Sequence, residues 1–221
     1  MSDTDSFIDE VTEEVRRDRL FRLMRRYGWI AVLAVLVLVG GAAYNEWRKA
    51  SERAMAEALG DRILAALSQD DRSARAKALA EIDAPAGGAQ GIVDMMAASE
   101  DVTEDPAAAA KRLLDLADDA ANAQIYRQIA TLKAVMIPDS GLTDQVRRER
   151  LDGLAMGSGV IRLLAEEQLA YLDIQAGDDE AALTRLQQVA ADAGATPGLR
   201  RRTTQVIVAL GGTPETGAQD G

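Results

Sequence analysis

One apolar segment near the amino terminus interrupts an otherwise mixed pattern of polar and hydrophobic residues. Between Arg26 and Glu46 lie 19 residues without a charged side chain. A helix of that length rises about 28 Å at ~1.5 Å per residue, close to the ~30 Å hydrocarbon thickness of a bilayer. Aromatic rings, which settle at the depth of lipid headgroups, frame the segment at Tyr27, Trp29, Tyr44 and Trp47. The pattern predicts a single transmembrane helix over residues 27–45, between a tail over 1–26 and a domain over 46–212.

The remaining chain shows the period of amphipathic helices. Apolar residues recur there every three or four positions, and the alternation typical of strands is scarce. Asp105 and Pro106 form a helix start, and Gly177 followed by Asp178 marks a stop and a restart. Asn122 is a further candidate cap. The sequence therefore predicts an all-α domain, whose packing residues include Leu113, Ile125, Ile129, Leu164, Leu169, Ala182 and Leu186.

Short turns join these predicted helices into pairs that repeat at roughly 34 to 37 residues, the period of a helical solenoid. Ala170 and Ala182 lie 12 residues apart, where a tetratricopeptide repeat has small residues. The expected aromatic positions are filled by Asp173 and Leu186. A tetratricopeptide-like solenoid of antiparallel helix pairs is the predicted arrangement, and a non-repeating helical bundle fits the same periodicity. From Thr213 onward the polar composition predicts a disordered tail over 213–221.

Cations on either side of the apolar segment indicate its orientation, because Arg and Lys are retained on the cytoplasmic side during insertion. Six arginines precede the segment, three of them at Arg22, Arg25 and Arg26, whereas four cations follow within 20 residues. We therefore expect a cytoplasmic tail and an outer carboxyl-terminal domain. A signal peptide cleaved after Ala43 is the alternative, since residues 41–43 are small. The long tail with seven acidic residues favours a retained anchor.

Charge and composition restrict what the outer domain can do. The whole chain carries 25 basic and 36 acidic residues, and without the tail about ten negative charges remain in excess. This excess argues against nucleic-acid binding and favours basic partner surfaces. The chain has no His and no Cys, so the commonest general base, metal ligand and thiol nucleophile are missing. We expect no enzyme, no cofactor and no metal site, although a hydrolase based on carboxylates, Lys, Ser or Tyr stays an alternative.

Three charge clusters could suggest ligand sites. The acidic residues around Asp118 and around Asp179 lack the spaced oxygen ligands and the central Gly of a calcium loop. They are interpreted as solvated faces and as acids at helix starts. The run Arg200-Arg201-Arg202 is interpreted as solvated cations near a helix start.

The amino-terminal residues carry a more specific similarity. Phe7-Ile8-Asp9-Glu10-Val11, Glu13-Glu14-Val15-Arg16-Arg17-Asp18-Arg19 and Arg26-Tyr27-Gly28-Trp29 lead directly into the apolar segment. This order of parts resembles the bacterial tetratricopeptide-like proteins of the YfgM type, over essentially residues 6–212. The resemblance implies a single-pass inner-membrane anchor and a periplasmic helical domain. It also implies association with the SecYEG translocon and with periplasmic chaperones.

Together these observations predict a membrane-anchored protein-binding scaffold that assists the Sec translocon and chaperone handover of secreted proteins. Its expected partners are proteins and, through one span, the lipid bilayer. A structural adaptor of another inner-membrane complex, respiratory or division, would have the same architecture. A soluble periplasmic binding factor would result if the segment were cleaved. The sequence does not indicate an oligomeric state.

Overall fold

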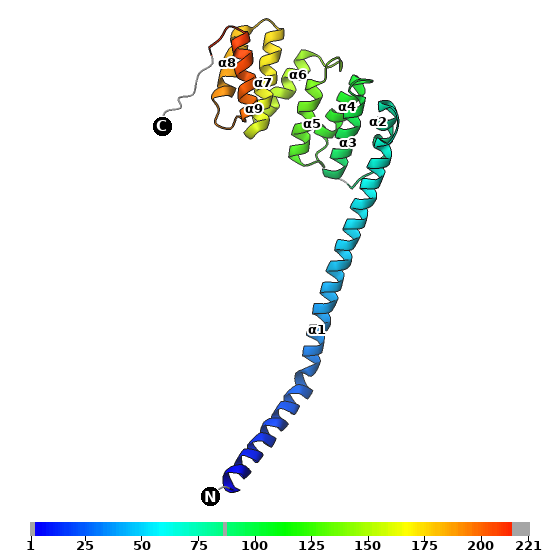
Figure 1. The fold of residues 1–221 in the computed structure, drawn as a ribbon, viewed down its shortest axis with the longest axis vertical. Coiled ribbons are helices and arrows are strands. Elements are labelled where there is room, and N and C mark those ends of the chain that lie inside the picture. The colour runs from blue at the N-terminus through cyan, green and yellow to red at the C-terminus, as the bar shows by residue number, and fades with distance from the viewer. Residues whose placement is uncertain (1–2, 86–87, 214–221) are drawn as a thin grey trace. The chain divides into compact units, whose positions relative to one another are not determined.

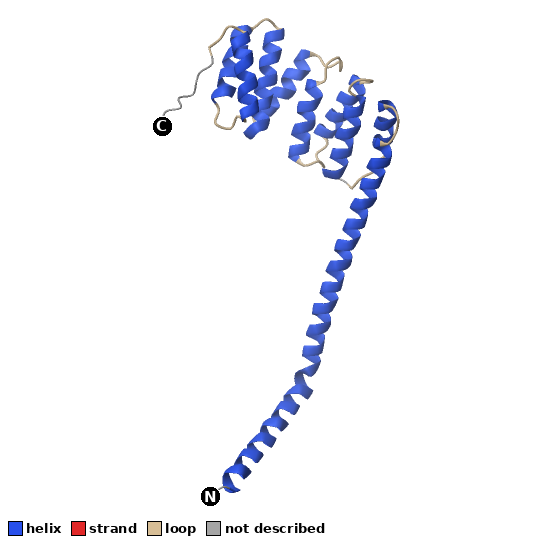
Figure 2. Cartoon of the chain, viewed as in Figure 1, coloured by secondary structure: helices blue, strands red, loops and turns tan. Residues whose placement is uncertain are grey.

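The computed structural model describes residues 3–85 and 88–213, with side chains from residue 24 onward except that of residue 31. Within these ranges every regular element is a helix and none is a strand (Figure 2). The all-α prediction is therefore confirmed. The predicted disorder of the carboxyl-terminal tail falls, beyond Thr213, outside the described residues.

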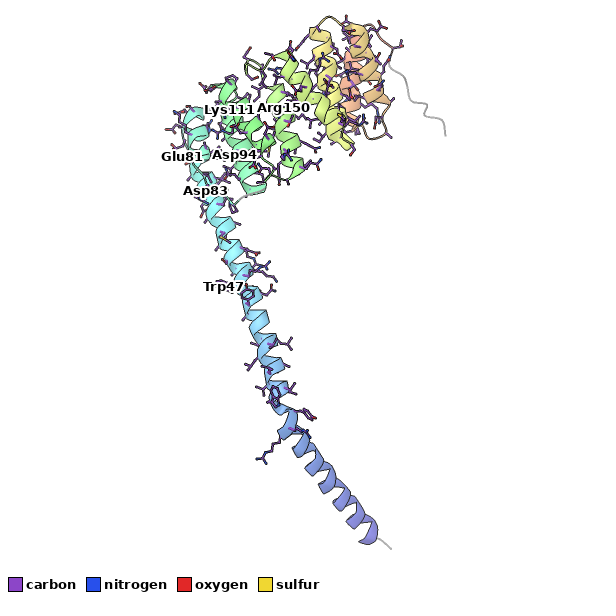
Figure 3. The ribbon with its side chains drawn as sticks, turned by 180° about the vertical axis from the view of Figure 1, so that it is seen from behind. Trp47, Glu81, Asp83, Asp94, Lys111 and Arg150 are labelled. Carbon is purple, nitrogen blue, oxygen red and sulfur yellow. The ribbon has the colours of Figure 1, made fainter. Side chains whose placement is uncertain are left out.

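Helix α1 (Asp3–Leu67) contains the apolar segment and continues without interruption on both sides of it. Its described part from Met24 is long and apolar enough to cross a membrane, and none of the apolar window is buried by protein. Trp47 is exposed on this helix (Figure 3), and its ring lies 6.1 Å from that of Tyr44. The predicted span over residues 27–45 lies inside this longer helix, which continues because good helix formers follow the apolar segment.

The chain divides into two compact units, residues 1–59 and residues 60–221. The first unit consists of α1 up to Leu59. The second begins inside the same helix, at Gly60. It contains the last turns of α1 followed by α2 (Arg72–Ala80), α3 (Gly88–Asp101), α4 (Pro106–Asp118), α5 (Gln124–Met136), α6 (Asp144–Ala155), α7 (Gly159–Gln175), α8 (Asp179–Ala191) and α9 (Pro197–Ala209).

Within the second unit each helix from α2 to α9 packs against the next (Figure 1). In addition, α3 contacts α5 and α5 contacts α7. The carboxyl-terminal residues of these three helices line shared hollows, so α3, α5 and α7 run in the same direction. They form one row, and the helices between them form the opposite layer.

Alanine dominates the contacts between α3, α4 and α5. Their cluster contains six alanines among nine buried residues: Ala98, Ala109, Ala110, Leu113, Leu116, Ala117, Ala130, Ala134 and Ile137. Small side chains at such contacts let helix axes approach closely. Between α5, α6 and α7 the core is mostly leucine, with Leu132, Leu151, Leu154, Leu169 and Leu172. Leu169, Ala182 and Leu186 are fully buried.

Helix starts follow local sequence signals in most cases. The carboxylate of Asp105 accepts a hydrogen bond from the amide of Ala108, with Pro106 in the first turn, as predicted. Asp178 caps α8 in the same way, after Gly177 has adopted the positive φ of 79° that ends α7. Asn122 does not cap α5. Its side-chain amide donates instead to the Leu116 carbonyl, and the cap position has no side-chain hydrogen bond.

Arginines connect the ends of consecutive helices. The fourth residue is arginine in α2, α5, α6 and α9, namely Arg75, Arg127, Arg147 and Arg200. Each donates to backbone carbonyls at the end of the preceding helix or in the turn that follows it. Arg127 Nε lies 2.8 Å from the Ala117 carbonyl oxygen, and Arg200 Nε lies 3.0 Å from that of Ala190. Because the last carbonyls of a helix have no intrahelical partner, these guanidinium groups stabilise the turns.

Candidate protein-binding face

One side of α5 presents apolar residues to solvent. Ile125 is 49% exposed and Met136 is 53% exposed, while Ile129 between them is half-buried. With Lys133 they follow a spacing of four, four and three, which places them on one side of a helix. Residues Ile125, Ile129, Lys133 and Met136 are called the α5 stripe below.

The α5 stripe corrects the predicted packing of this helix. Ile125 was expected between helices, yet it is exposed, and the buried residues of α5 are Ala130, Thr131, Leu132, Ala134 and Val135. Apart from Leu132 these side chains are small, which fits the close contacts with α4 and α6. Nothing in the described chain covers Ile125 and Met136 fully.

Helices α3 and α7 present similar stripes beside α5. Ile92 of α3 and Val160 of α7 are exposed, and Met96 and Leu164, one turn further along each helix, are half-buried. Helices α3, α5 and α7 contact one another in turn, so their exposed and half-buried apolar residues are grouped as one candidate surface. This surface, the α5 stripe with Ile92, Met96, Val160 and Leu164, is called the apolar face. Contiguous exposed apolar surfaces of this kind mark interaction sites.

Two hollows lie at the end of the apolar face. The α3–α5 hollow, of about 210 Å³, is lined by Ala98, Ser99, Val102, Leu113, Lys133, Met136, Ile137 and Pro138. The α5–α7 hollow, of about 500 Å³, is lined by residues that include Val135, Met136, Pro138, Tyr171 and Leu172. Met136 borders both and forms the ridge between them. The walls of the α3–α5 hollow are mostly apolar, so a partner's apolar side chain can insert there. The α5–α7 hollow has more polar walls, which include Asp139, Asp144 and Arg147.

The carboxylates of α5 and α7 are absent or paired. The sequence of α5 contains none, although the chain as a whole has an excess of acidic residues. On α7, Glu166 and Asp173 lie 2.7 Å and 2.9 Å from nitrogens of Arg185. Glu167 lies 2.7 Å from Arg202. The α5 stripe is therefore not acidic, whereas the α5–α7 hollow at its end is lined by two carboxylates, Asp139 and Asp144.

The pair Glu167–Arg202 holds α7 against α9. Glu167 is only 2% exposed, and both its oxygens accept hydrogen bonds from Arg202, a residue 35 positions away. The Tyr171 hydroxyl also donates to Glu167 at 3.3 Å. Burial and the adjacent carboxylate raise the pKa of Tyr171, so its hydroxyl stays protonated as a donor. All three residues of Arg200-Arg201-Arg202 are exposed, as interpreted, but Arg200 and Arg202 also bind a backbone carbonyl and Glu167.

The acidic clusters form ion pairs and helix caps. Lys111 and Arg150, labelled in Figure 3, lie 2.6 Å from Asp115 and 2.5 Å from Asp118. Hydrogen bonds from Arg150 lower the pKa of Asp118. Across residues 24–85 and 88–213, no three His, Cys, Asp or Glu side chains lie close enough together to hold a metal ion.

The predicted anchor and topology residues all fall on α1. Tyr27, Trp29, Tyr44 and Trp47 are exposed, as are Arg25 and Arg26. The guanidinium of Arg26 lies 5.8 Å from the centre of the Tyr27 ring, within range of a cation–π interaction. The side chain of Arg22 lies outside the described residues. A polar headgroup region suits this combination of cation and ring.

Comparison with known proteins gives no further assignment. No protein-family model, no curated protein and no solved structure matches this chain.

Proposed function

We propose that this chain is a membrane-anchored, non-enzymatic protein-binding module, and that the apolar face is where its partners bind. The observation that carries the proposal is the α5 stripe. Isoleucine and methionine lie there in solvent beside two hollows, on a helix without a carboxylate, in a chain with net charge −11. Large apolar side chains on a surface otherwise kept soluble by charge indicate a binding function.

A tetratricopeptide-like solenoid is the proposed arrangement of α2 to α9. The order of contacts supports it, since consecutive helices pair and the alternate helices α3, α5 and α7 also meet. The two small residues predicted from the repeat, Ala170 and Ala182, lie in one buried cluster with Leu186 and Ile207. In such arrays the row of alternate helices provides an extended binding surface.

The resemblance to the YfgM type supplies the location and the partners that we propose. The tail over 1–26 would be cytoplasmic, residues 27–45 would span the bacterial inner membrane, and the domain would lie in the periplasm. There the apolar face would assist the SecYEG translocon and hand secreted chains to periplasmic chaperones. Tethering raises the local concentration of a weak binding surface near its partners, which suits transient transfer.

Crosslinking in native membranes tests this proposal. A photoreactive residue at Met136, on the apolar face, is expected to capture translocon subunits or periplasmic chaperones. The same residue at Thr184, exposed on α8 in the other layer, serves as the matched control and is expected to capture neither. Recovery of a respiratory or division complex from Met136, without translocon subunits, would replace the Sec assignment with the adaptor alternative. Equal products from both positions would contradict the apolar face as the binding surface.

A further inference from the structure

We infer that the segment bound by the apolar face is an amphipathic α-helix that lies along α5, and that an acidic residue beside its apolar stripe pairs with Lys133. This inference rests on the proposed function of the apolar face and specifies the chemistry of its partner.

The shape of the α5 stripe favours a helical partner. From Ile125 to Met136 the stripe follows three turns of α5, about 16 Å at ~1.5 Å per residue. Its side chains repeat every three or four residues, so they form the ridges of an unpaired helix surface. A second helix of about 12 residues, with apolar residues at the same spacing, can interdigitate with these ridges over their whole length. Its end would insert side chains into the hollows beside Met136.

Lys133 gives this surface its charge. It is exposed between Ile129 and Met136, and it forms no ion pair with any side chain of the described chain. Other cations of the same region are engaged. Arg127, also on α5, donates to a backbone carbonyl, and Arg150 of α6 pairs with a carboxylate. Other exposed cations, such as Lys77 and Arg201, also form no ion pair among the described residues, and what distinguishes Lys133 is its position beside an apolar hollow.

The surroundings of Lys133 favour a carboxylate there. It lines the α3–α5 hollow, where Ser99 is the other polar residue. A partner helix that covers this hollow would exclude water from the ammonium group, and a carboxylate would then compensate the lost hydration. Lys133 also lies in the last turn of α5, where a cation interacts favourably with the helix dipole. If the interaction with the helix dipole were the only role of Lys133, its substitution would change stability but not the choice of partner.

Charges on the two sides of Met136 determine which edge of the partner helix is acidic. Asp139 and Asp144 line the α5–α7 hollow on the other side of Met136. The acidic residue of the partner should therefore face α3, and residues toward α7 should be neutral or basic. The net negative charge of the whole chain predicts the opposite, a preference for basic partners. At the contact itself the local charges determine the preference, because charges further apart than about 8 Å are largely screened at physiological ionic strength.

Peptide binding to the full-length protein in detergent micelles tests the inference. Two fluorescent helical peptides share apolar residues at spacings of three and four, and differ only in carrying Glu or Lys along one edge of that stripe. The wild-type protein is expected to bind the Glu peptide about tenfold more tightly than the Lys peptide, from one gained ion pair and one avoided repulsion. Lys133→Glu should reverse this preference, and Lys133→Arg should preserve it.

The outcomes separate the inference from the proposed function. If both peptides bind equally to the wild type, or if Lys133→Glu leaves the preference unchanged, the pairing with Lys133 is overturned. In that case, if Ile129→Asp binds both peptides more weakly than the wild type does, the apolar face remains the binding surface. If neither peptide binds above a scrambled control, the apolar face fails together with the inference. The melting temperatures of Lys133→Glu and Lys133→Gln are compared. If they are equal, a changed peptide preference in Lys133→Glu does not reflect unfolding.

Discussion

Leu186→Asp is expected to lower the free energy of unfolding of the helical domain by about 3–5 kcal/mol, as removal of a large core side chain does, with further cost from the buried charge. Leu186 is 0% exposed and packs in one cluster with Ala170, Ala182 and Ile207. A carboxylate there replaces the apolar contacts that join α7, α8 and α9. Since a domain has only about 5–15 kcal/mol of stability in total, a large part of it would be lost.

The measurement is urea unfolding of the full-length protein in detergent, followed by far-ultraviolet circular dichroism. Thr184→Asp is the matched control, because Thr184 lies two residues earlier on α8 and is exposed. The control should stay within about 0.5 kcal/mol of the wild type, as surface substitutions do. Equal midpoints for the two variants would show that Leu186 does not lie in the core of this domain.

Arg202→Ala is the second substitution with a large expected effect, a loss of about 3 kcal/mol in the free energy of unfolding. Removing one partner of a buried ion pair leaves an uncompensated charge. Here the charge is Glu167, which is 2% exposed and would keep only the hydrogen bond from Tyr171. The expected loss lies at the lower end of the range for broken buried ion pairs, because the Arg202 side chain is itself 53% exposed.

Arg201→Ala provides the control for this second prediction. Arg201 is the exposed neighbour of Arg202 on α9, so its loss should change stability by less than about 0.5 kcal/mol. Adding Glu167→Gln to Arg202→Ala should recover part of the loss, since a neutral amide is less costly to bury than a carboxylate. A loss in Arg202→Ala no larger than in Arg201→Ala would mean that the ion pair does not hold α7 to α9.

Local signals explain which parts of the fold were predictable. The apolar segment of α1, the start of α4 at Asp105 and the restart at Asp178 depend on residues within one or two turns of each other. The sequence pattern predicted helix in most of the outer domain but did not specify that α1 continues unbroken to Leu67, because residues 46–59 mix polar and apolar side chains and show no clear end or start signal.

Choices that depend on distant residues could not be made from the sequence. Helix α5 has two apolar sides, one of Ala and Val and one of Ile and Met, and periodicity alone does not decide which side is buried. The pair Glu167–Arg202 joins residues 35 positions apart. The lack of acidic residues in α5 did not single it out, since α2 and α9 lack them too.

The topology of the chain in spheroplasts tests most directly whether α1 holds the helical domain outside the inner membrane. With a carboxyl-terminal tag, protease added to intact spheroplasts should remove the tag. A fragment containing the tail and residues 27–45 should stay in the membrane after a carbonate wash. Protection of the full-length protein, or release of a soluble protein that begins at Tyr44, would contradict the account.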